Sequence, residues 1–115
     1  MSSVSDEVLA EIVDAVVKEV HPEQIYLFGS RARGQASPDS DLDLLVIERE
    51  SFGGRRSRRS EMAKIWRLLS RFRVPKDILV YSWEEVERWR TARNHIIARA
   101  LREGRLLYER PRRGR

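Results

Sequence analysis

The sequence contains no cysteine among its 115 residues. This absence excludes a disulfide-bonded scaffold, a thiol nucleophile and a zinc site with cysteine ligands. No apolar run is long enough to cross a bilayer. The N-terminus has no basic segment followed by an apolar one, so we expect no signal peptide. We therefore expect a soluble protein of the cytoplasm with no membrane attachment.

Charged residues, in contrast, are abundant. They make up 36% of the chain, whereas about a quarter is usual in a globular domain. Hydrophobic residues make up 41%, which is enough to form a core and argues against global disorder. The length leaves room for one domain. We expect this domain to span residues 1–109 and to be followed by a basic tail, residues 110–115.

The charges are unevenly distributed along the chain. Residues 1–54 hold 4 basic and 11 acidic side chains, whereas residues 55–115 hold 19 basic and 7 acidic ones. Most of the basic residues are arginines, whose planar fork suits phosphate and carboxylate groups. Two interpretations remain open, a solvated arginine-rich face or a surface for a phosphate-bearing or acidic partner.

The spacing of apolar residues predicts alternating helices and strands. Apolar residues recur at helical spacing over residues 5–20, with Ser5 as N-cap and Pro22 beyond the end. Two more helices are predicted over residues 60–72, with Trp66 in the core, and over residues 83–103, where polar residues 91–94 favour a kink or break. Strands are predicted over residues 25–28, 41–47, 74–81 and 106–108, and a mobile basic loop over residues 51–59.

This order of elements predicts an α+β fold of two layers, in which helices pack on a small mixed sheet. The first two strands are joined by a compact loop, so we expect them to be antiparallel neighbours. Pro75 places the third predicted strand at an edge of the sheet or at a strand end, because proline cannot donate to the ladder. Gly104 is suited to end the last helix.

Three aspartates stand at the starts of otherwise apolar strands. Asp41 and Asp43 open one strand, and Asp77 lies near the start of another. Side chains two apart on a strand project to the same face, with their α-carbons about 6.6 Å apart. Carboxylates so placed can converge on two divalent ions, and bound cations would relieve the cost of their burial. A third carboxylate from a neighbouring strand would complete the site.

A turn suited to phosphate precedes these aspartates. Gly29 and Ser30 follow the first predicted strand directly, and Arg33 lies on the same turn. Glycine allows close approach of the backbone to a ligand, backbone N–H groups bind anions, and the arginine fork binds phosphate. A Gly-Ser turn or an Asp-x-Asp pair alone is common. Their combination, with ten residues between Ser30 and Asp41, favours metal-dependent phosphoryl or nucleotidyl transfer.

The segments GSRARG at residues 29–34 and SDLDL at residues 40–44 resemble the signature of the DNA polymerase β-like nucleotidyltransferase superfamily. Within it, the chain resembles the minimal nucleotidyltransferases, the MNT group, which are often the antitoxins of HEPN–MNT toxin–antitoxin pairs. Asp77 before an apolar strand and the ending over residues 102–109 extend the resemblance to most of the chain.

The resemblance implies a role for each motif residue. Asp41 and Asp43 would bind two Mg²⁺ ions, and Asp77 would share one ion and help to activate the attacking hydroxyl. Gly29 and Ser30 would hold the triphosphate of ATP. Arg33 matches an arginine that the family signature carries after the Gly-Ser pair.

The resemblance also implies a reaction and a partner. AMP would pass from ATP to a hydroxyl, such as a tyrosine of a partner HEPN toxin, and the chain would act as an antitoxin. Two alternatives remain, a non-catalytic antitoxin that neutralises the toxin by binding, or a nucleotidyltransferase acting on a small molecule or RNA. We do not expect direct nucleic-acid binding by the basic residues 55–59, because aromatic residues are not interleaved with them.

Overall fold

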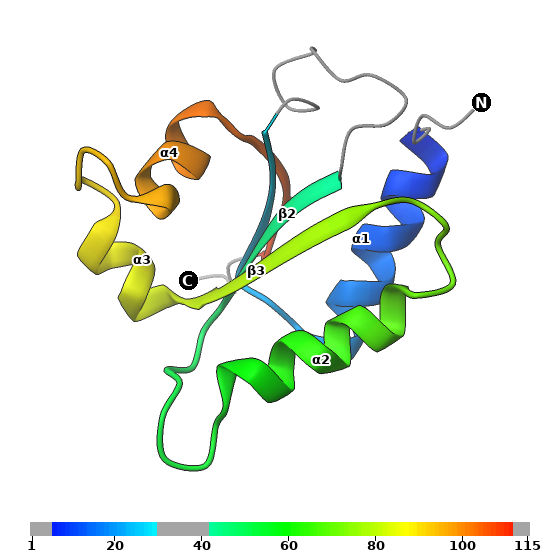
Figure 1. Cartoon of the computed structure of the whole chain (residues 1–115), viewed down its shortest axis with the longest axis horizontal. Coiled ribbons are helices and arrows are strands. Elements are labelled where there is room, and N and C mark those ends of the chain that lie inside the picture. The colour runs from blue at the N-terminus through cyan, green and yellow to red at the C-terminus, as the bar shows by residue number, and fades with distance from the viewer. Residues whose placement is uncertain (1–5, 30–41, 112–115) are drawn as a thin grey trace.

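The structure, a computed structural model, describes residues 6–29 and 42–111. These residues form four helices and four strands (Figure 1). In chain order they are α1 (Asp6–Val20), β1 (Gln24–Phe28), β2 (Leu42–Glu48), α2 (Arg58–Leu69), β3 (Lys76–Ser82), α3 (Trp83–Trp89), α4 (Ile96–Glu103) and β4 (Arg105–Glu109). None of the helices within this part of the chain is long and apolar enough to cross a membrane.

The four strands form one mixed sheet in the order β3-β2-β1-β4. Strand β1 pairs antiparallel with β2 and with β4, whereas β2 and β3 run parallel. The predicted antiparallel neighbours are therefore confirmed. The strand that follows Pro75, β3, lies at one edge of the sheet, as the proline predicts.

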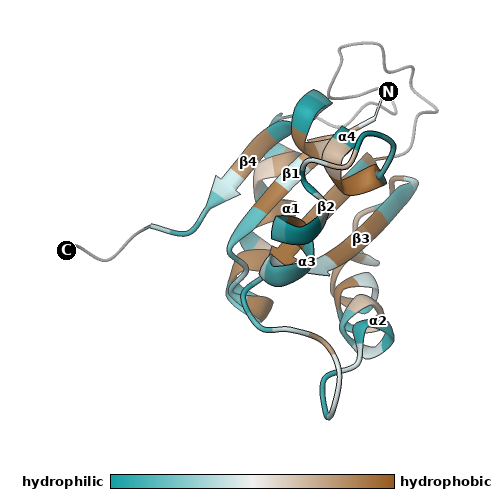
Figure 2. Cartoon of the chain, turned by 90° about the vertical axis from the view of Figure 1, so that its left-hand side faces the viewer, coloured by the Kyte–Doolittle hydropathy of each residue, from teal (hydrophilic) through white to brown (hydrophobic). Residues whose placement is uncertain are grey.

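The main hydrophobic core lies between one face of the sheet and helices α1 and α2 (Figures 1 and 2). Strand β2 is central and contributes alternate side chains to this core, because successive residues of a strand point to opposite faces. The helices contribute their apolar stripes. The fully or nearly fully buried members are Leu9, Ile12 and Val16 of α1, Ile65 and Leu69 of α2, Leu42, Leu44 and Val46 of β2, Ile25 and Leu27 of β1, and Ile78 and Val80 of β3.

The opposite face of the sheet carries a smaller core under the short helices α3 and α4. Leu45 and Ile47 of β2 pack there against Val86 of α3 and against Ile97 and Ala100 of α4. These helices add a partial third layer to the two layers that the sequence predicts. The α+β class with a small mixed sheet is confirmed, and β2 reads as a continuous apolar run because both of its faces are covered.

The long helix predicted over residues 83–103 is two helices. The first begins with a capping box, in which the Ser82 side chain accepts from the Glu85 amide and Glu85 accepts from the Ser82 amide. The chain leaves the helix after Trp89, in the polar segment where a kink or break is predicted. His95 then caps α4, since its Nδ1 accepts from the Ile97 amide at 3.1 Å. The predicted N-cap of α1, Ser5, lies outside the described residues.

One prediction about the second half of the chain is wrong. Trp66 lies outside the core with 40% of its surface exposed. The predicted basic loop contains a turn in which Gly53 and Arg56 exchange backbone hydrogen bonds of 2.8 and 2.9 Å, and its mobility stays a prediction. Arg56 reaches back to the Glu48 carboxylate, and Arg58 pairs with Glu85, so neither arginine is a free surface cation.

Candidate active site

Two of the predicted carboxylates lie opposite each other on the parallel strands. Asp43 is the second residue of β2, Asp77 is the second residue of β3, and the two are register partners. Neighbouring strands are about 4.8 Å apart. Asp43 alternates with Leu45 on the face that α3 and α4 cover, and Asp77 alternates with Leu79 on the same face. Both aspartates therefore project to one side of the sheet, at the start of each strand.

Burial differs between the two aspartates. Asp43 is half-buried on a central strand, whereas Asp77 is exposed on the edge strand β3. A ligand held by both carboxylates would thus be enclosed on the β1 side and open on the β3 side. The open side leaves room for a second substrate to approach Asp77.

Gly29 closes the site on the β1 side. It follows directly after β1, whose last residue, Phe28, is the register partner of Asp43. Its φ of +79° is a backbone conformation that favours glycine. A β-carbon on Gly29 would lie 2.3 Å from Oδ2 of Asp43. The backbone at Gly29 therefore lies directly against the Asp43 carboxylate, so a phosphate bound at Gly29 would lie next to a cation held by Asp43.

The other predicted site residues lie outside the described part of the chain. These residues are Ser30, Arg33 and Asp41. The shared orientation of Asp41 and Asp43 therefore stays a prediction. Within residues 6–29 and 42–111, no three acidic or histidine side chains are grouped closely enough to hold a metal ion. The described pair, Asp43 and Asp77, supplies the hard carboxylate oxygens that Mg²⁺ prefers.

A second close backbone contact lies beside the site. Gly104 ends α4, and a β-carbon there would lie 2.8 Å from the Leu27 carbonyl oxygen and 2.3 Å from that of Ala100. Leu27 is two residues before Gly29 on β1. The end of α4 is thus fixed against the strand that delivers Gly29, a contact that helix periodicity in the sequence does not reveal.

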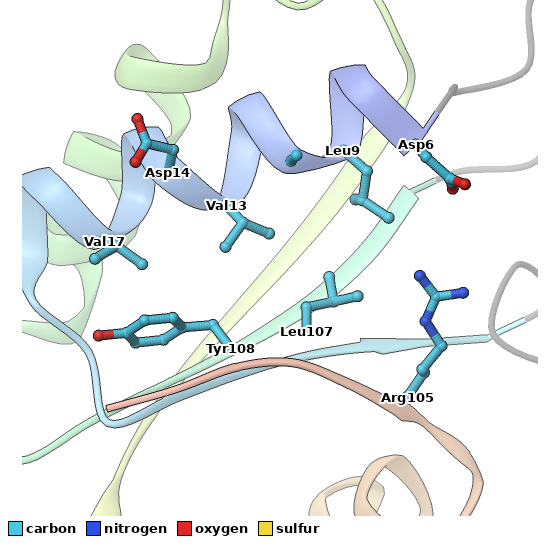
Figure 3. Close-up of a pocket in the computed structure, with 9 residues that line it drawn as sticks. Asp6, Leu9, Val13, Asp14, Val17, Arg105, Leu107 and Tyr108 are labelled. Atoms are coloured by element: carbon cyan, nitrogen blue, oxygen red, sulfur yellow. The ribbon is translucent and has the colours of Figure 1, made fainter. Parts of the chain in front are cut away.

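An apolar groove of about 410 Å³ lies between α1 and β4 (Figure 3). Leu9, Val13 and Val17 of α1 face Leu107 and Tyr108 of β4 across it. The polar side chains that also line it are Asp6, Asp14 and Arg105. This groove lies on the α1 face of the sheet, whereas Asp43 and Asp77 project to the opposite face. It is therefore separate from the candidate active site.

A buried carboxylate lies at the far end of β2. Glu48 is only 4% exposed, and its Oε1 accepts from Arg56 Nη2 at 3.1 Å. Burial, together with a hydrogen bond that protonated Glu48 donates to Glu61, raises the pKa of Glu48 to about 7, although Arg56 opposes the shift. Glu48 is the fifth residue after Asp43 on β2, which places their α-carbons about 17 Å apart at the usual rise per residue. Glu48 is thus too far from Asp43 to take part in the same site.

The polymerase β nucleotidyltransferase family profile matches residues 10–113, which include both aspartates and Gly29. The chain belongs to this family. Among proteins of curated function, none matches the sequence.

Solved structures share the fold of this nucleotidyltransferase. A protein from Sulfolobus solfataricus, assigned to the nucleotidyltransferases, is 25% identical with a TM-score of 0.63, over 90% of this chain and 79% of that one. A variant of the MntA–HpeT toxin–antitoxin is 18% identical with a TM-score of 0.61, over 89% and 72% of the two chains. A toxin–antitoxin determined with AMP-PNP is 22% identical with a TM-score of 0.56, over 87% and 73%.

Proposed function

We propose that this nucleotidyltransferase transfers AMP from ATP to a hydroxyl of a partner protein, a tyrosine of a HEPN toxin, and so acts as its antitoxin. One observation carries the proposal: Asp43 faces Asp77 across two parallel strands while the backbone of Gly29 lies against the Asp43 carboxylate. This arrangement combines a pair of acidic metal ligands with a backbone that can approach phosphate.

Each site residue would have a role that follows from its position. Asp43, with Asp41, would hold two Mg²⁺ ions, and Asp77 would share one of them. Gly29 and Ser30 would bind the triphosphate through backbone N–H groups and the hydroxyl, with Arg33 as a further phosphate ligand. The bound ions would lower the pKa of the acceptor hydroxyl and neutralise the pyrophosphate that leaves.

The exposure of Asp77 supports its role toward the acceptor. Asp77 lies on the edge strand, where a hydroxyl from another molecule can reach it, and its carboxylate would accept the proton of that hydroxyl. The hydroxyl oxygen would then form a bond to the α-phosphorus as the bond to pyrophosphate breaks. Asp43, half-buried beside Gly29, would remain on the nucleotide side.

The choice of ATP and of a toxin as substrates is supported by the structural relatives. Two of the similar structures are toxin–antitoxins, and one of them was determined with AMP-PNP, an analogue of ATP. Nucleic acid is disfavoured as a direct partner of the basic segment at residues 55–59, because two of its four arginines, Arg56 and Arg58, are paired with carboxylates within the fold.

Intact-mass spectrometry of a HEPN partner protein tests the proposal. The partner is incubated with ATP, Mg²⁺ and either the wild-type chain or the Asp43→Asn/Asp77→Asn variant. We expect the partner to gain whole AMP units only with the wild type. Asp14→Asn, which removes an exposed carboxylate on α1, is the matched control and should retain the activity. Neutralisation of the partner without any mass gain would instead identify a non-catalytic antitoxin.

A further inference from the structure

One exposed surface adjoins Asp77 along the chain at the start of the edge strand β3, on the α2 face of the sheet. We call it the α2–β3 basic surface and define it by Trp66, Arg67, Arg71, Arg73 and Lys76. Trp66 and Arg67 lie in the last turn of α2, Arg71 and Arg73 lie between α2 and β3, and Lys76 begins β3. Figure 1 shows the end of α2 and the start of β3 on the same side of the molecule.

Lys76 connects the exposed tryptophan to the candidate active site. Its ammonium group lies 5.4 Å from the centroid of the Trp66 ring and donates to the Phe72 carbonyl oxygen at 3.1 Å. Lys76 directly precedes Asp77, and consecutive α-carbons are about 3.8 Å apart. Trp66 therefore contacts the residue next to a proposed catalytic carboxylate. Tryptophan is among the residues that dominate protein–protein binding.

The charge of this surface is not balanced within the fold. Arg67, Arg71 and Arg73 are exposed, and none forms an ion pair with a carboxylate of the described residues. In contrast, Arg88 of α3 and Arg90 directly after it pair with acidic residues of that helix. Unbalanced positive charge around an exposed aromatic residue is complementary to an acidic polypeptide.

A typical protein–protein interface is large enough to reach from Asp77 to the α2–β3 basic surface. A standard interface covers about 800 Å² of each partner, equivalent to a disc of about 16 Å radius. Asp77 projects to the opposite face from Lys76 and Trp66, but β3 is the edge strand, so a partner of this size that brings a hydroxyl to Asp77 would extend around the edge and cover both residues. The partial negative charge at the end of α2 also favours Arg67 there, so far-ultraviolet circular dichroism must show that a variant of Arg67 keeps its helices before its binding is compared.

From these contacts we propose that the α2–β3 basic surface docks an acidic segment of the protein that carries the acceptor hydroxyl. This inference rests on the proposed function and names the surface that selects its protein substrate. Trp66 packs on apolar atoms of the segment, the arginines bind its carboxylates, and the hydroxyl is thereby placed at Asp77.

Tryptophan fluorescence tests the docking step without any chemistry. In the Trp83→Phe/Trp89→Phe variant, Trp66 is the sole tryptophan and reports on its own surface. The probes are two peptides, in which one tyrosine is flanked by glutamates or by lysines. We expect only the acidic peptide to shift the emission of Trp66 and to shield it from a quencher, with an affinity that falls as salt rises. Equal responses to both peptides overturn the proposal.

Charge reversal at two ends of α2 provides the matched comparison. Arg67→Glu/Arg71→Glu changes the docking surface, whereas Arg55→Glu/Arg59→Glu makes the same change in net charge near the start of α2. We expect the first variant to bind the acidic peptide about tenfold more weakly and the second to bind it nearly as the wild type does. Equal weakening in both would show a response to net charge alone and would overturn a local docking site.

Transfer assays separate this inference from the proposed function. With ATP and Mg²⁺, the Arg67→Glu/Arg71→Glu variant should show an increased KM for the acidic peptide, with the larger effect on KM rather than on kcat. Transfer with the same KM for both peptides overturns the docking surface but supports the proposed function. Specific binding of the acidic peptide without transfer supports the docking surface and contradicts the proposed function. Displacement of the peptide by an RNA oligonucleotide at lower concentration overturns an acidic polypeptide as the occupant.

Discussion

The backbone of Gly29 and the carboxylate of Asp43 are in such close contact that a β-carbon on Gly29 would lie 2.3 Å from Oδ2 of Asp43. Gly29 also has a φ of +79°, which costs a residue with a side chain about 1–2 kcal/mol. The glycine is thus required both by its backbone conformation and by its neighbour. The close contact with Asp43 means that the end of strand β1 fixes the space available to a catalytic carboxylate on β2.

We expect Gly29→Ala to lower the transfer rate at least about 100-fold, because a displacement of about 1 Å at a catalytic group has an effect of this size. The free energy of unfolding should fall by about 1–3 kcal/mol. Gly54→Ala is the matched control, since Gly54 also has a positive φ, +57°, but has no atom within 4 Å of its added β-carbon. It should lose stability and keep activity. Loss of activity in both variants would show that backbone strain alone is responsible.

Asp43 and Asp77 should contribute to the binding of Mg²⁺ and nucleotide as well as to the transfer rate. We expect Mg²⁺ with AMP-PNP to raise the free energy of unfolding of the wild type, by about 2.7 kcal/mol at a concentration a hundredfold above Kd. Asp43→Asn and Asp77→Asn should each lose most of this gain, whereas Asp14→Asn should keep it. Thermal unfolding with and without the ligands measures the effect. A full ligand-induced shift in Asp43→Asn would contradict its proposed role as a metal ligand.

The buried Glu48 predicts a dependence of stability on pH. Burial raises its pKa from 4.5 to about 7 in the folded chain, so the folded state binds more protons than the unfolded state between these values. Stability is therefore highest below pH 4.5 with respect to this group, falls as pH rises toward 7, and is constant above that. A shift of this size corresponds to a loss of up to about 3 kcal/mol.

Glu48→Gln should remove this slope, because the amide cannot ionise. We expect the variant to be more stable than the wild type at pH 8 and similar to it at pH 4. Glu50→Gln is the control, since Glu50 also lies near Arg56 but is exposed. Denaturant unfolding over this pH range measures the slopes. A slope that persists in Glu48→Gln would assign the titration to another group.

The local patterns in the sequence predict the helices and strands but not which of their faces are covered by other parts of the fold. Continuous apolar residues predict β2, and a helix is predicted from residue 83, where the capping box of Ser82 and Glu85 begins α3. Trp66 is different. It lies at the margin of the apolar stripe of α2, and β3, against which α2 packs, is the edge strand, so no further strand covers this side. Helical spacing identifies a stripe and cannot show how much of it the sheet covers.

For the candidate site too, the sequence predicts the residues but not how the fold brings them together. The residue types and spacing indicate a metal and phosphate site, and a third acid on a neighbouring strand is expected. That Asp77 is the register partner of Asp43 depends on a parallel pairing formed through α2, which no local pattern encodes. The roles of Ser30, Arg33 and Asp41 remain predictions from the sequence.

Gly104 offers a test of why glycine is needed at the end of α4. Helix-ending glycines commonly adopt the left-handed conformation, in which asparagine is also tolerated. Here the backbone of Gly104 is extended, with φ −84°, and the constraint is the close approach of the Leu27 and Ala100 carbonyl oxygens. Backbone atoms cannot move aside as a flexible side chain can, so any β-carbon must displace α4 or β1.

We therefore expect Gly104→Ala and Gly104→Asn to be equally destabilising, by about 2–3 kcal/mol, and to reduce transfer because β1 delivers Gly29 to Asp43. Denaturant unfolding and the transfer rate are measured for both. If Gly104→Asn were nearly as stable as the wild type while Gly104→Ala was not, the glycine would act as a left-handed cap, and the close contact with β1 would have to relax. Equal losses would instead establish that α4 is held against β1 through backbone contact, so that the helix supports the strand beside the site.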